Sequence, residues 1–537
     1  MSEEKTVGYI IGGISLSPDT DPREACRIAA REIKRAGGSP ARLSFDICKR
    51  SVDARKKNDV RLVYSVAVRA KDGGEIRHIK SKYSLSLLYD RKLDFSIGKE
   101  KTSLSPLVVG MGPAGLFCAL LLAENGYAPT IIDRGDSVSN RVEAYRRFFE
   151  LGILDTECNI QFGAGGAGTF SDGKLLTRVN DPRTAYVLER FCDFGAPEEI
   201  KIQAKPHIGT DLLYGVVDGM LSRIAELGGR VMYRTRLERI INRADGSITA
   251  VTTEENIDCS CLCLATGHSA RDTYEMLIES GYSVEPKPIS VGVRIEHLQS
   301  RIDEALLGSF AGHPRIGRGE YHLSDTTGER GVYTFCMCPG GQVVAAASED
   351  GGVVVNGMSE YARDGKNANS AVCVSIRPED YGNTPRGAIA FQRKLERDAY
   401  IKGGSDYYAP MQTVGDFLEG RCGGEPTDVI PTYRGGRVRP ASMDEILPEY
   451  VCKELRRGLY SFERKVSGFA SPSAILSGVE TRTSAPVRIL RNVELCALGH
   501  DRVYPCGEGA GYAGGITSAA LDGIRVAEKI MGRFAPK

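Results

Sequence analysis

The sequence predicts an α/β fold with a Rossmann-like ββα domain, an inserted domain built on a mostly antiparallel β-sheet, and a small N-terminal α+β domain. A chain of 537 residues is too long for one hydrophobic core. A glycine turn between two apolar runs occupies residues 107–135, and short alternating strands fill residues 285–440. The expected domains are 1–100 (N-terminal), 105–280 (Rossmann-like, first part), 281–440 (inserted cap) and 441–537 (Rossmann-like, second part).

The composition is ordinary for a globular protein. Apolar residues make up 42% of the chain and charged residues 26%. The net charge of +1 argues against binding of nucleic acid or membranes by the protein as a whole. The chain begins without the basic region and long apolar core of a signal peptide, and no run of 18 apolar residues occurs. We therefore expect a cytoplasmic protein without membrane contacts; the oligomeric state stays open.

The fifteen cysteines do not follow a disulfide or metal pattern. No C-x-x-C occurs, and Cys336 and Cys338 alternate along one predicted strand, as Cys259, Cys261 and Cys263 do on another. Zinc and iron–sulfur sites need ligand spacings and histidine partners that are missing here. The sequence predicts reduced, buried thiols and no metal.

The N-terminal region reads as a small α/β unit. We expect a strand at Val7–Ile11, a helix near Asp21–Ala36, two strands around a basic loop, and a turn at Asp72–Gly74. Residues 1–100 contain 21 Lys and Arg but 14 Asp and Glu, which makes this unit +7. A solvated basic face explains such a charge more simply than RNA binding, which is kept as an alternative.

The glycine turn is the main motif of the chain. A predicted buried strand, Leu107–Val109, leads into Gly110-x-Gly112-x-x-Gly115 and then into a buried helix that Gly126 can end. A second strand, Thr130–Ile132, ends at Asp133. This order is typical of dinucleotide binding. The first glycine allows the turn, the second lets a pyrophosphate approach, and the third lets helix and strand pack. The turn alone does not distinguish FAD from NAD.

The remaining elements follow along the chain. They are a helix at 139–152, a glycine cluster at 161–175, a helix at 212–228, a strand at 230–233, a hairpin turning at 245–246, a strand ending in Ala265-Thr266-Gly267, and a final strand, glycine loop and helix beginning near residue 502.

Separated segments resemble the glutathione-reductase-like, two-segment Rossmann flavoprotein superfamily. They are the glycine turn with Asp133, the strand ending in Ala265-Thr266-Gly267, and the terminal Gly507-Glu508 and Gly514-Gly515-Ile516. Finer motifs resemble the uncharacterised FAD-utilising dehydrogenase family: "GAGGAGTFSDGKL", "FCMCPGGQVVAAASEDGGVVVNGMS" with "NANSA", "VETRTSAPVRIL", and an N-terminal extension carrying "RSVDARKK". The resemblance covers nearly the whole chain.

The resemblance implies FAD as the cofactor. A second glycine loop far downstream agrees, because a long FAD can run across two segments. The superfamily usually has Asp where Glu508 stands, so the carry-over to this residue is weaker. The implied cofactor-binding residues are Gly110, Gly112, Pro113, Ala114, Gly115, Asp133, Arg134, Gly165, Gly166, Lys174, Thr266, Gly267, Gly507, Glu508, Gly514, Gly515 and Ile516.

The reaction is predicted only by class. We expect an FAD-dependent oxidoreductase that moves a hydride between flavin and an unidentified small metabolite, with NAD(P)H as a candidate transient electron partner. No C-x-x-C adjoins the first helix, which argues against disulfide reduction of the glutathione-reductase kind. His207, Arg482 and Tyr512 are the candidates for catalytic residues. The alternatives are a flavoprotein acting on RNA and a flavin-fold binding protein without turnover.

Overall fold

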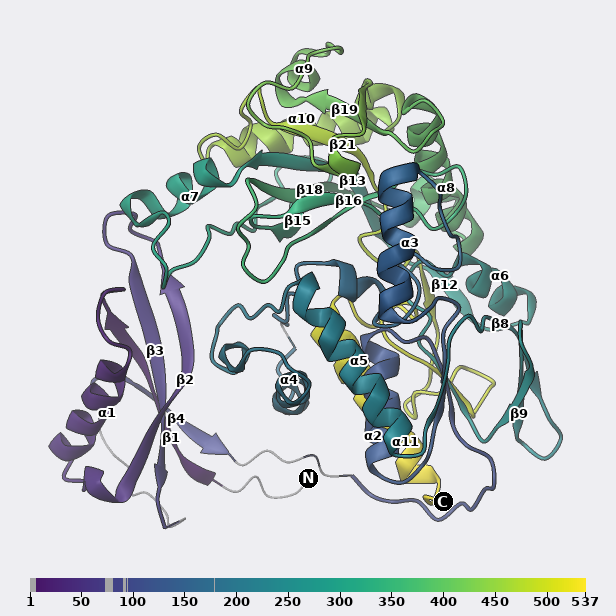
Figure 1. Cartoon of the computed structure of the whole chain (residues 1–537), viewed down its shortest axis with the longest axis horizontal. Coiled ribbons are helices and arrows are strands. Elements are labelled where there is room, and N and C mark those ends of the chain that lie inside the picture. The colour runs from purple at the N-terminus through teal and green to yellow at the C-terminus, as the bar shows by residue number, and fades with distance from the viewer. Residues whose placement is uncertain (1–5, 73–80, 90–92, 94, 178) are drawn as a thin grey trace.

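The structure, a computed structural model, describes residues 6–72, 81–89, 93, 95–177 and 179–537. Three regions are visible in Figure 1. The N-terminal unit stands at one side, a bundle of long helices covers the central parallel sheet, and a second large sheet lies above them. The predicted turn at Asp72–Gly74 extends beyond the described residues.

The N-terminal unit is an antiparallel sheet with strand order β2-β3-β1-β4, covered by helix α1. Strand β1 is longer than predicted, because a bulge between Ile11 and Ile14 carries the strand through Gly12 and Gly13 instead of ending there. The elements are β1 (Thr6–Leu16), α1 (Arg23–Arg35), β2 (Leu43–Asp53), β3 (Arg61–Ala70) and β4 (Ser84–Tyr89).

The central sheet is parallel, as the glycine-turn pattern predicts, with strand order β23-β11-β5-β6-β7. Its outer two strands on one side come from parts of the chain far downstream of the glycine turn. The strands are β5 (Leu107–Val109), β6 (Thr130–Ile132), β7 (Arg230–Met232), β11 (Leu262–Leu264) and β23 (Val503–Pro505).

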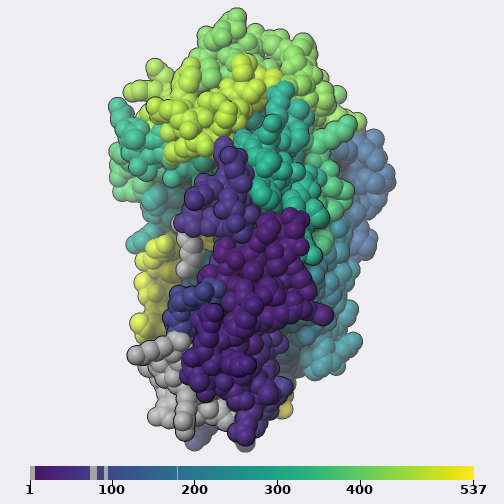
Figure 2. Space-filling view, turned by 90° about the vertical axis from the view of Figure 1, so that its left-hand side faces the viewer, coloured from purple at the N-terminus to yellow at the C-terminus, as the bar shows by residue number. Residues whose placement is uncertain are grey.

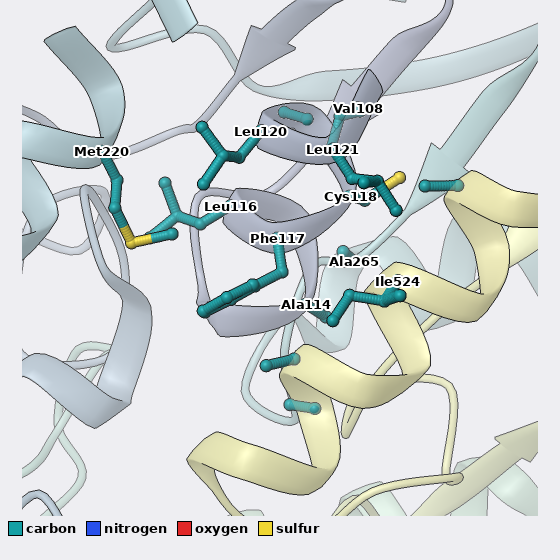
Figure 3. Packing of buried hydrophobic residues seen from close by; sticks show 14 of the residues in the cluster. Val108, Ala114, Leu116, Phe117, Cys118, Leu120, Leu121, Met220, Ala265 and Ile524 are labelled. Atoms are coloured by element: carbon teal, nitrogen blue, oxygen red, sulfur yellow. The ribbon is translucent and has the colours of Figure 1, made fainter. Parts of the chain in front are cut away.

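Helix α2 (Pro113–Glu124) is buried on all sides, which explains why its sequence is apolar all round. Leu116 points toward Met220 of α5 (Thr210–Glu226), and Ile524 of α11 (Ile516–Arg533) lies beside Ala114 (Figure 3). A Cβ on Gly523 would stand 2.0 Å from the carbonyl oxygen of Ala114. The two glycine-capped helices therefore touch backbone to backbone.

Other elements complete this domain. A three-stranded antiparallel sheet, order β10-β9-β8, contains the predicted hairpin at 245–246. The elements are α3 (Val138–Leu151), α4 (Arg183–Asp193), β8 (Leu237–Asn242), β9 (Ile248–Thr252), β10 (Asn256–Cys259), α6 (Arg271–Glu279), β12 (Val284–Pro286) and β22 (Val487–Ile489).

The inserted domain contains a seven-stranded sheet with order β14-β15-β18-β13-β21-β19-β20, antiparallel except for the β19–β20 pair. Strand β21 lies between β13 and β19, so the sheet extends past the predicted boundary at residue 440. The strands are β13 (Ile289–Leu298), β14 (Ser324–Asp325), β15 (Val332–Cys338), β18 (Asn367–Ile376), β19 (Ala409–Thr413), β20 (Val438–Pro440) and β21 (Ile475–Glu480), with a separate pair β16 (Gln342–Ala345) and β17 (Val355–Met358).

This domain also contains helices that the sequence did not predict. In α8, Gln392 and Glu396 occupy the buried face, which interrupts the apolar stripe that would have marked the helix. The helices are α7 (Gln299–Leu307), α8 (Pro385–Lys402), α9 (Val414–Glu419) and α10 (Glu449–Glu463). No helix among the described residues combines the length and apolar character that crossing a membrane requires.

The N-terminal unit is docked on both other domains. Figure 2 shows it lying against the remainder of the molecule. Val60 packs with Leu307 and Ile316 of the inserted domain. The backbone of Arg50 bonds residues near 203, donating to the Ile202 carbonyl at 2.6 Å and accepting from Ala204 at 2.8 Å.

Replacing Gly523 with Ala tests the contact between α2 and α11. The added methyl would overlap the Ala114 carbonyl, so we expect a loss of about 1–3 kcal/mol in the free energy of unfolding, measured by urea denaturation followed by circular dichroism. The matched control is Gly215→Ala in α5, where no described atom lies within 4 Å of the new Cβ. This control should be stabilised by about 0.5–1 kcal/mol. Equal effects of the two substitutions would contradict the contact.

Candidate functional site

One cavity of about 540 Å³ lies between the Rossmann-like domain and the inserted sheet. Its walls include both predicted glycine segments, although roughly 400 residues separate them in sequence. The predicted cofactor residues that line it are Gly110, Gly112, Pro113, Ala114, Asp133, Arg134, Gly166, Lys174, Thr266, Gly267, Glu508, Gly514, Gly515 and Ile516.

The glycine turn has the shape that its three glycines require. Gly110 has φ +107°, and a Cβ there would lie 2.2 Å from the Ala265 carbonyl oxygen. A Cβ on Gly115 would lie 1.8 Å from the Gly110 carbonyl oxygen, so this glycine serves packing and does not line the cavity. At Gly112 the nearest atom to such a Cβ, among the described residues, is the Gly166 Cα at 3.9 Å. The backbone at Gly112 is therefore open to a ligand.

A second backbone opening lies at the start of α11. Within the described part of the chain, no heavy atom comes within 4 Å of a Cβ built on Gly514 or Gly515. Helix α11 begins at Ile516, so its unpaired N–H groups face this open space. A Cβ on Gly168 would lie 3.1 Å from Ile516 and 3.7 Å from Pro113. The glycine cluster thus bridges the two helix N-termini, and both have room for backbone contacts with a dinucleotide.

Asp133 and Arg134 line the cavity but already have protein partners. The Asp133 carboxylate accepts from the N–H groups of Met111 at 2.7 Å and Gly135 at 2.9 Å. Each carboxylate oxygen keeps a second lone pair for a ribose. Arg134 donates to both oxygens of Asp272 at 2.8 Å and lies over the Phe162 ring at 4.5 Å. Both side chains are therefore held in place by other parts of the protein.

Lys174 lines the cavity, but its ammonium already has protein partners. Its ammonium is bonded to the buried Asp172 and to the carbonyl oxygen of Met337. Arg363 also donates to Asp172. Burial alone would raise the pKa of the Asp172 carboxyl, but the charges of Lys174 and Arg363 hold it below its usual range. This cluster joins the glycine loop to strand β15 of the inserted sheet.

Two further predicted glycines lie behind the cavity wall. The N–H of Gly165 donates to the Met111 carbonyl at 2.8 Å, which ties the glycine cluster to the glycine turn. The N–H of Gly507 donates to Asp522 at 2.8 Å, and a Cβ there would lie 2.7 Å from Ala114. Neither glycine lines the cavity, so both support the binding segments from behind.

Two of the three catalytic candidates lie outside the described set of cavity-lining residues. The His207 imidazole is 3.1 Å from the Tyr361 carbonyl oxygen and stacks on the Tyr361 ring. The Arg491 guanidinium lies over the Tyr512 ring, 3.7 Å from the ring centre. Both side chains therefore make contacts with other protein groups outside the cavity wall.

The third candidate, Arg482, lines the cavity but is held in place by a buried ion pair. Its guanidinium donates to both oxygens of Glu396 at 3.1 Å and 2.9 Å. Arg271 of α6 binds the same carboxylate at 2.9 Å and 2.6 Å. This arrangement links both domains and makes Arg482 part of the cavity wall.

The polar centre of the opposite wall was missed by sequence reasoning. It is the fully buried Arg294 of β13, which donates to Glu480 at 3.0 Å, to Asn356 at 3.2 Å and to the Cys336 carbonyl at 2.5 Å. Glu480, Asn356 and Cys336 all line the cavity. The signal was weak because these residues come from four strands or strand ends far apart in the chain.

Two carboxyls of the cavity wall have pKa values that are raised toward neutral pH. Burial raises the pKa of Glu480 to about 7, against the opposing charge of Arg294. Burial likewise raises the pKa of Glu508 to about 7, although Lys287 opposes the shift. Carboxyls of this kind can give or take a proton near pH 7.

His268 was also missed, although it directly follows the predicted Gly267. It lines the cavity, and its Nδ1 is 2.9 Å from the Ser269 hydroxyl. Burial and the charges of Arg482 and Arg271 lower the pKa of His268 to about 3. The imidazole is therefore neutral near pH 7 and acts there as a hydrogen-bonding group.

Comparisons with known proteins give a family model that matches the inserted domain and a relative that matches nearly the whole chain. Residues 288–483 match a family described as "FAD-dependent protein, C-terminal domain-like", and residues 12–69 match a domain of unknown function (DUF8436). An uncharacterized protein of Clostridium beijerinckii is 45% identical over 537 residues, which covers 98% of each chain. The chain belongs to one family with the Clostridium beijerinckii protein, and its segment 288–483 matches the model of a domain found in FAD-dependent proteins. The narrower assignment to a dehydrogenase family stays a prediction.

Similarity to solved structures is distant. The flavin-dependent halogenase CmlS aligns with a TM-score of 0.38 and 11% identity, covering 80% of this chain and 59% of CmlS. CtdE in complex with FAD aligns with a TM-score of 0.33 and 11% identity, covering 80% of this chain and 87% of CtdE. Aklavinone-11 hydroxylase, in a complex with FAD and aklavinone, aligns with a TM-score of 0.33 and 15% identity, covering 80% and 63% of the two chains.

The raised pKa of Glu480 predicts a pH-dependent stability. Its carboxyl has a pKa of about 7 in the folded protein against 4.5 as the ordinary value, so the folded state holds the proton over this interval. The contribution of this protonated carboxyl to the free energy of unfolding is complete below about pH 4.5 and is lost as pH rises through 7. We expect the unfolding free energy of the wild type to fall by about 1–3 kcal/mol relative to Glu480→Gln between roughly pH 5 and 8. Exposed Glu254→Gln is the control, and identical curves for all three proteins would contradict the assignment.

Proposed function

We propose that this FAD-dependent protein is an oxidoreductase that moves a hydride between FAD and a small metabolite bound in the same cavity. The observation that carries the proposal is the composition of the cavity wall. One side consists of backbone openings at two helix N-termini, and the other presents Glu480, Asn356 and Cys336 from the inserted domain. A cofactor and a substrate can therefore meet between the two sides.

The chain's own residues would hold the cofactor mainly through backbone. The N–H groups at the start of α2, beside Gly112, suit a pyrophosphate, and those at Gly515 and Ile516 suit the electron-rich edge of a flavin. Thr266 and Gly267 line the cavity between these openings. FAD bound there would supply the hydride chemistry itself.

The inserted domain would orient the substrate and handle its proton. Glu480 is the best-placed group for proton transfer, because it is buried, faces the cavity and has a pKa near 7. Arg294 fixes its direction through the 3.0 Å contact, and Asn356, held by the same guanidinium, offers an amide to a polar substrate. His268 and Arg482 complete the polar wall.

Anaerobic reduction tests the activity. Purified holoprotein is mixed with NADH, NADPH or a panel of small metabolites while flavin absorbance is recorded. We expect at least one of these donors to bleach the flavin, and Glu480→Gln to keep its FAD while the fastest donor reduces it about 10²–10⁴-fold more slowly. Flavin that no donor reduces would favour the alternative of a flavin-fold binding protein without turnover.

The RNA-binding alternative stays a prediction that a separate experiment decides. Arg55 of the basic N-terminal loop is paired with Asp53 through contacts of 2.8 Å and 2.5 Å. Salt-dependent binding of RNA by the full-length holoprotein would favour this alternative. Absence of binding at low salt would discard it.

Gly112→Val tests the position of the cofactor. The new side chain would enter the cavity, where the described neighbours leave space for it, so the protein should fold yet lose most of its bound FAD. FAD released on denaturation is measured by absorbance, and circular dichroism checks the fold. Gly215→Val on the exposed face of α5 is the control and should keep its FAD. Full FAD content in Gly112→Val would refute this placement.

A further inference from the structure

Cys336 and Cys338 lie at an irregular end of strand β15 that faces the cavity. A β-bulge between Phe335 and Cys338 breaks the pairing with β18, and Cys336 has φ +44°. Such a conformation is uncommon for a residue other than glycine and persists only where surrounding contacts enforce it. The bulge exposes Cys336 on the cavity wall while Cys338 stays buried behind it.

The contacts around the pair fix both residues. The Cys338 thiol donates to the Cys336 carbonyl at 3.3 Å. Arg294 donates to the same carbonyl at 2.5 Å and contacts the Cys338 sulfur at 3.6 Å. One buried guanidinium therefore fixes both the strained backbone and the second cysteine.

The electrostatics favour one thiolate and one thiol. The neighbouring Cys338 side chain, together with the charges of Arg294 and Lys174, lowers the pKa of Cys336 to about 5. The neighbouring Cys336 sulfur raises the pKa of Cys338. A thiolate beside a thiol is the arrangement from which disulfides form and exchange.

A second pair of cysteines beside the cavity, Cys506 and Cys263, has no thiol with a lowered pKa. Cys506 lines the cavity, and both it and the neighbouring Cys263 are fully buried. Burial raises the pKa of the Cys506 thiol, so this pair stays protonated near pH 7. It serves as an internal reference in the same protein.

We propose that Cys336 and Cys338 form a redox-active dithiol that exchanges two electrons with the FAD bound in the same cavity. This inference rests on the proposed function, and it gives the inserted domain a redox group of its own. On oxidation the S–H bond of Cys338 breaks and an S–S bond forms between the two sulfurs. Two electrons and the proton pass to oxidised FAD. The reverse step returns them from reduced FAD and restores one thiolate and one thiol.

Electron counting on the holoprotein tests the proposal. Protein oxidised with diamide and freed of reagent is titrated anaerobically with dithionite while flavin absorbance is recorded. We expect the wild type to take up four electrons per FAD, because the disulfide adds one two-electron couple to that of the flavin. Cys336→Ser and Cys338→Ser should take up two, and the exposed control Cys422→Ser should take up four.

Thiol labelling gives a readout that is independent of the flavin and of any variant. Wild-type protein is denatured in N-ethylmaleimide before and after the reductive titration, and its peptides are weighed by mass spectrometry. The peptide with residues 336–338 should carry no label when oxidised and two labels when reduced, while Cys263 and Cys506 stay labelled throughout. Two electrons per FAD with Cys336 and Cys338 labelled in both states would overturn the dithiol and leave the proposed function intact. Protein that binds no FAD would instead refute the proposed function.

Discussion

The close contact between α2 and α11 is the constraint on which the remaining arrangement depends. Ala114 and Gly523 bring the two helices together at backbone distance, and Gly507 packs on Ala114 from the strand end that precedes α11. A larger side chain at either glycine would push apart two segments that meet only in the folded state. Because they meet, both helix N-termini open into a single cavity. This is the geometry that a dinucleotide longer than one binding loop requires.

Buried arginines organise the other side of the cavity. Arg294 gathers a carboxyl, the amides of Asn356 and Asn369, and two cysteines from four strands of the inserted domain. Arg271 and Arg482 share Glu396, and so connect α6 of the Rossmann-like domain with α8 and the segment after β21. Removing one partner from such a site leaves a buried charge uncompensated, so these ion pairs hold the two domains in one orientation. Charge pairing therefore contributes to the shape of the cavity alongside apolar packing.

The parts that could be predicted from the sequence are those encoded locally. The glycine turn, its buried helix and the terminal glycine loop each combine glycines with apolar runs of the right length, and the structure places them as expected. The antiparallel character of the inserted sheet also followed from alternating short runs. The sequence pattern does not predict helix α8, because Gln392 and Glu396 occupy its buried face and make hydrogen bonds and ion pairs there. Strand β21 was assigned to the wrong side of a boundary because its partners lie far away in sequence.

The cavity wall with the two helix N-termini could be predicted from the sequence, whereas the opposite wall could not. Backbone-lined openings leave a glycine signature, whereas the wall around Arg294 is assembled from side chains that no local pattern connects. The central claim, that two distant segments bind a single FAD, is tested most directly by a crystal structure of the protein purified with its cofactor. The account predicts one FAD molecule in contact with both Gly112 and Gly515. Density for FAD that touches only one of these residues, or that lies outside this cavity, would contradict it.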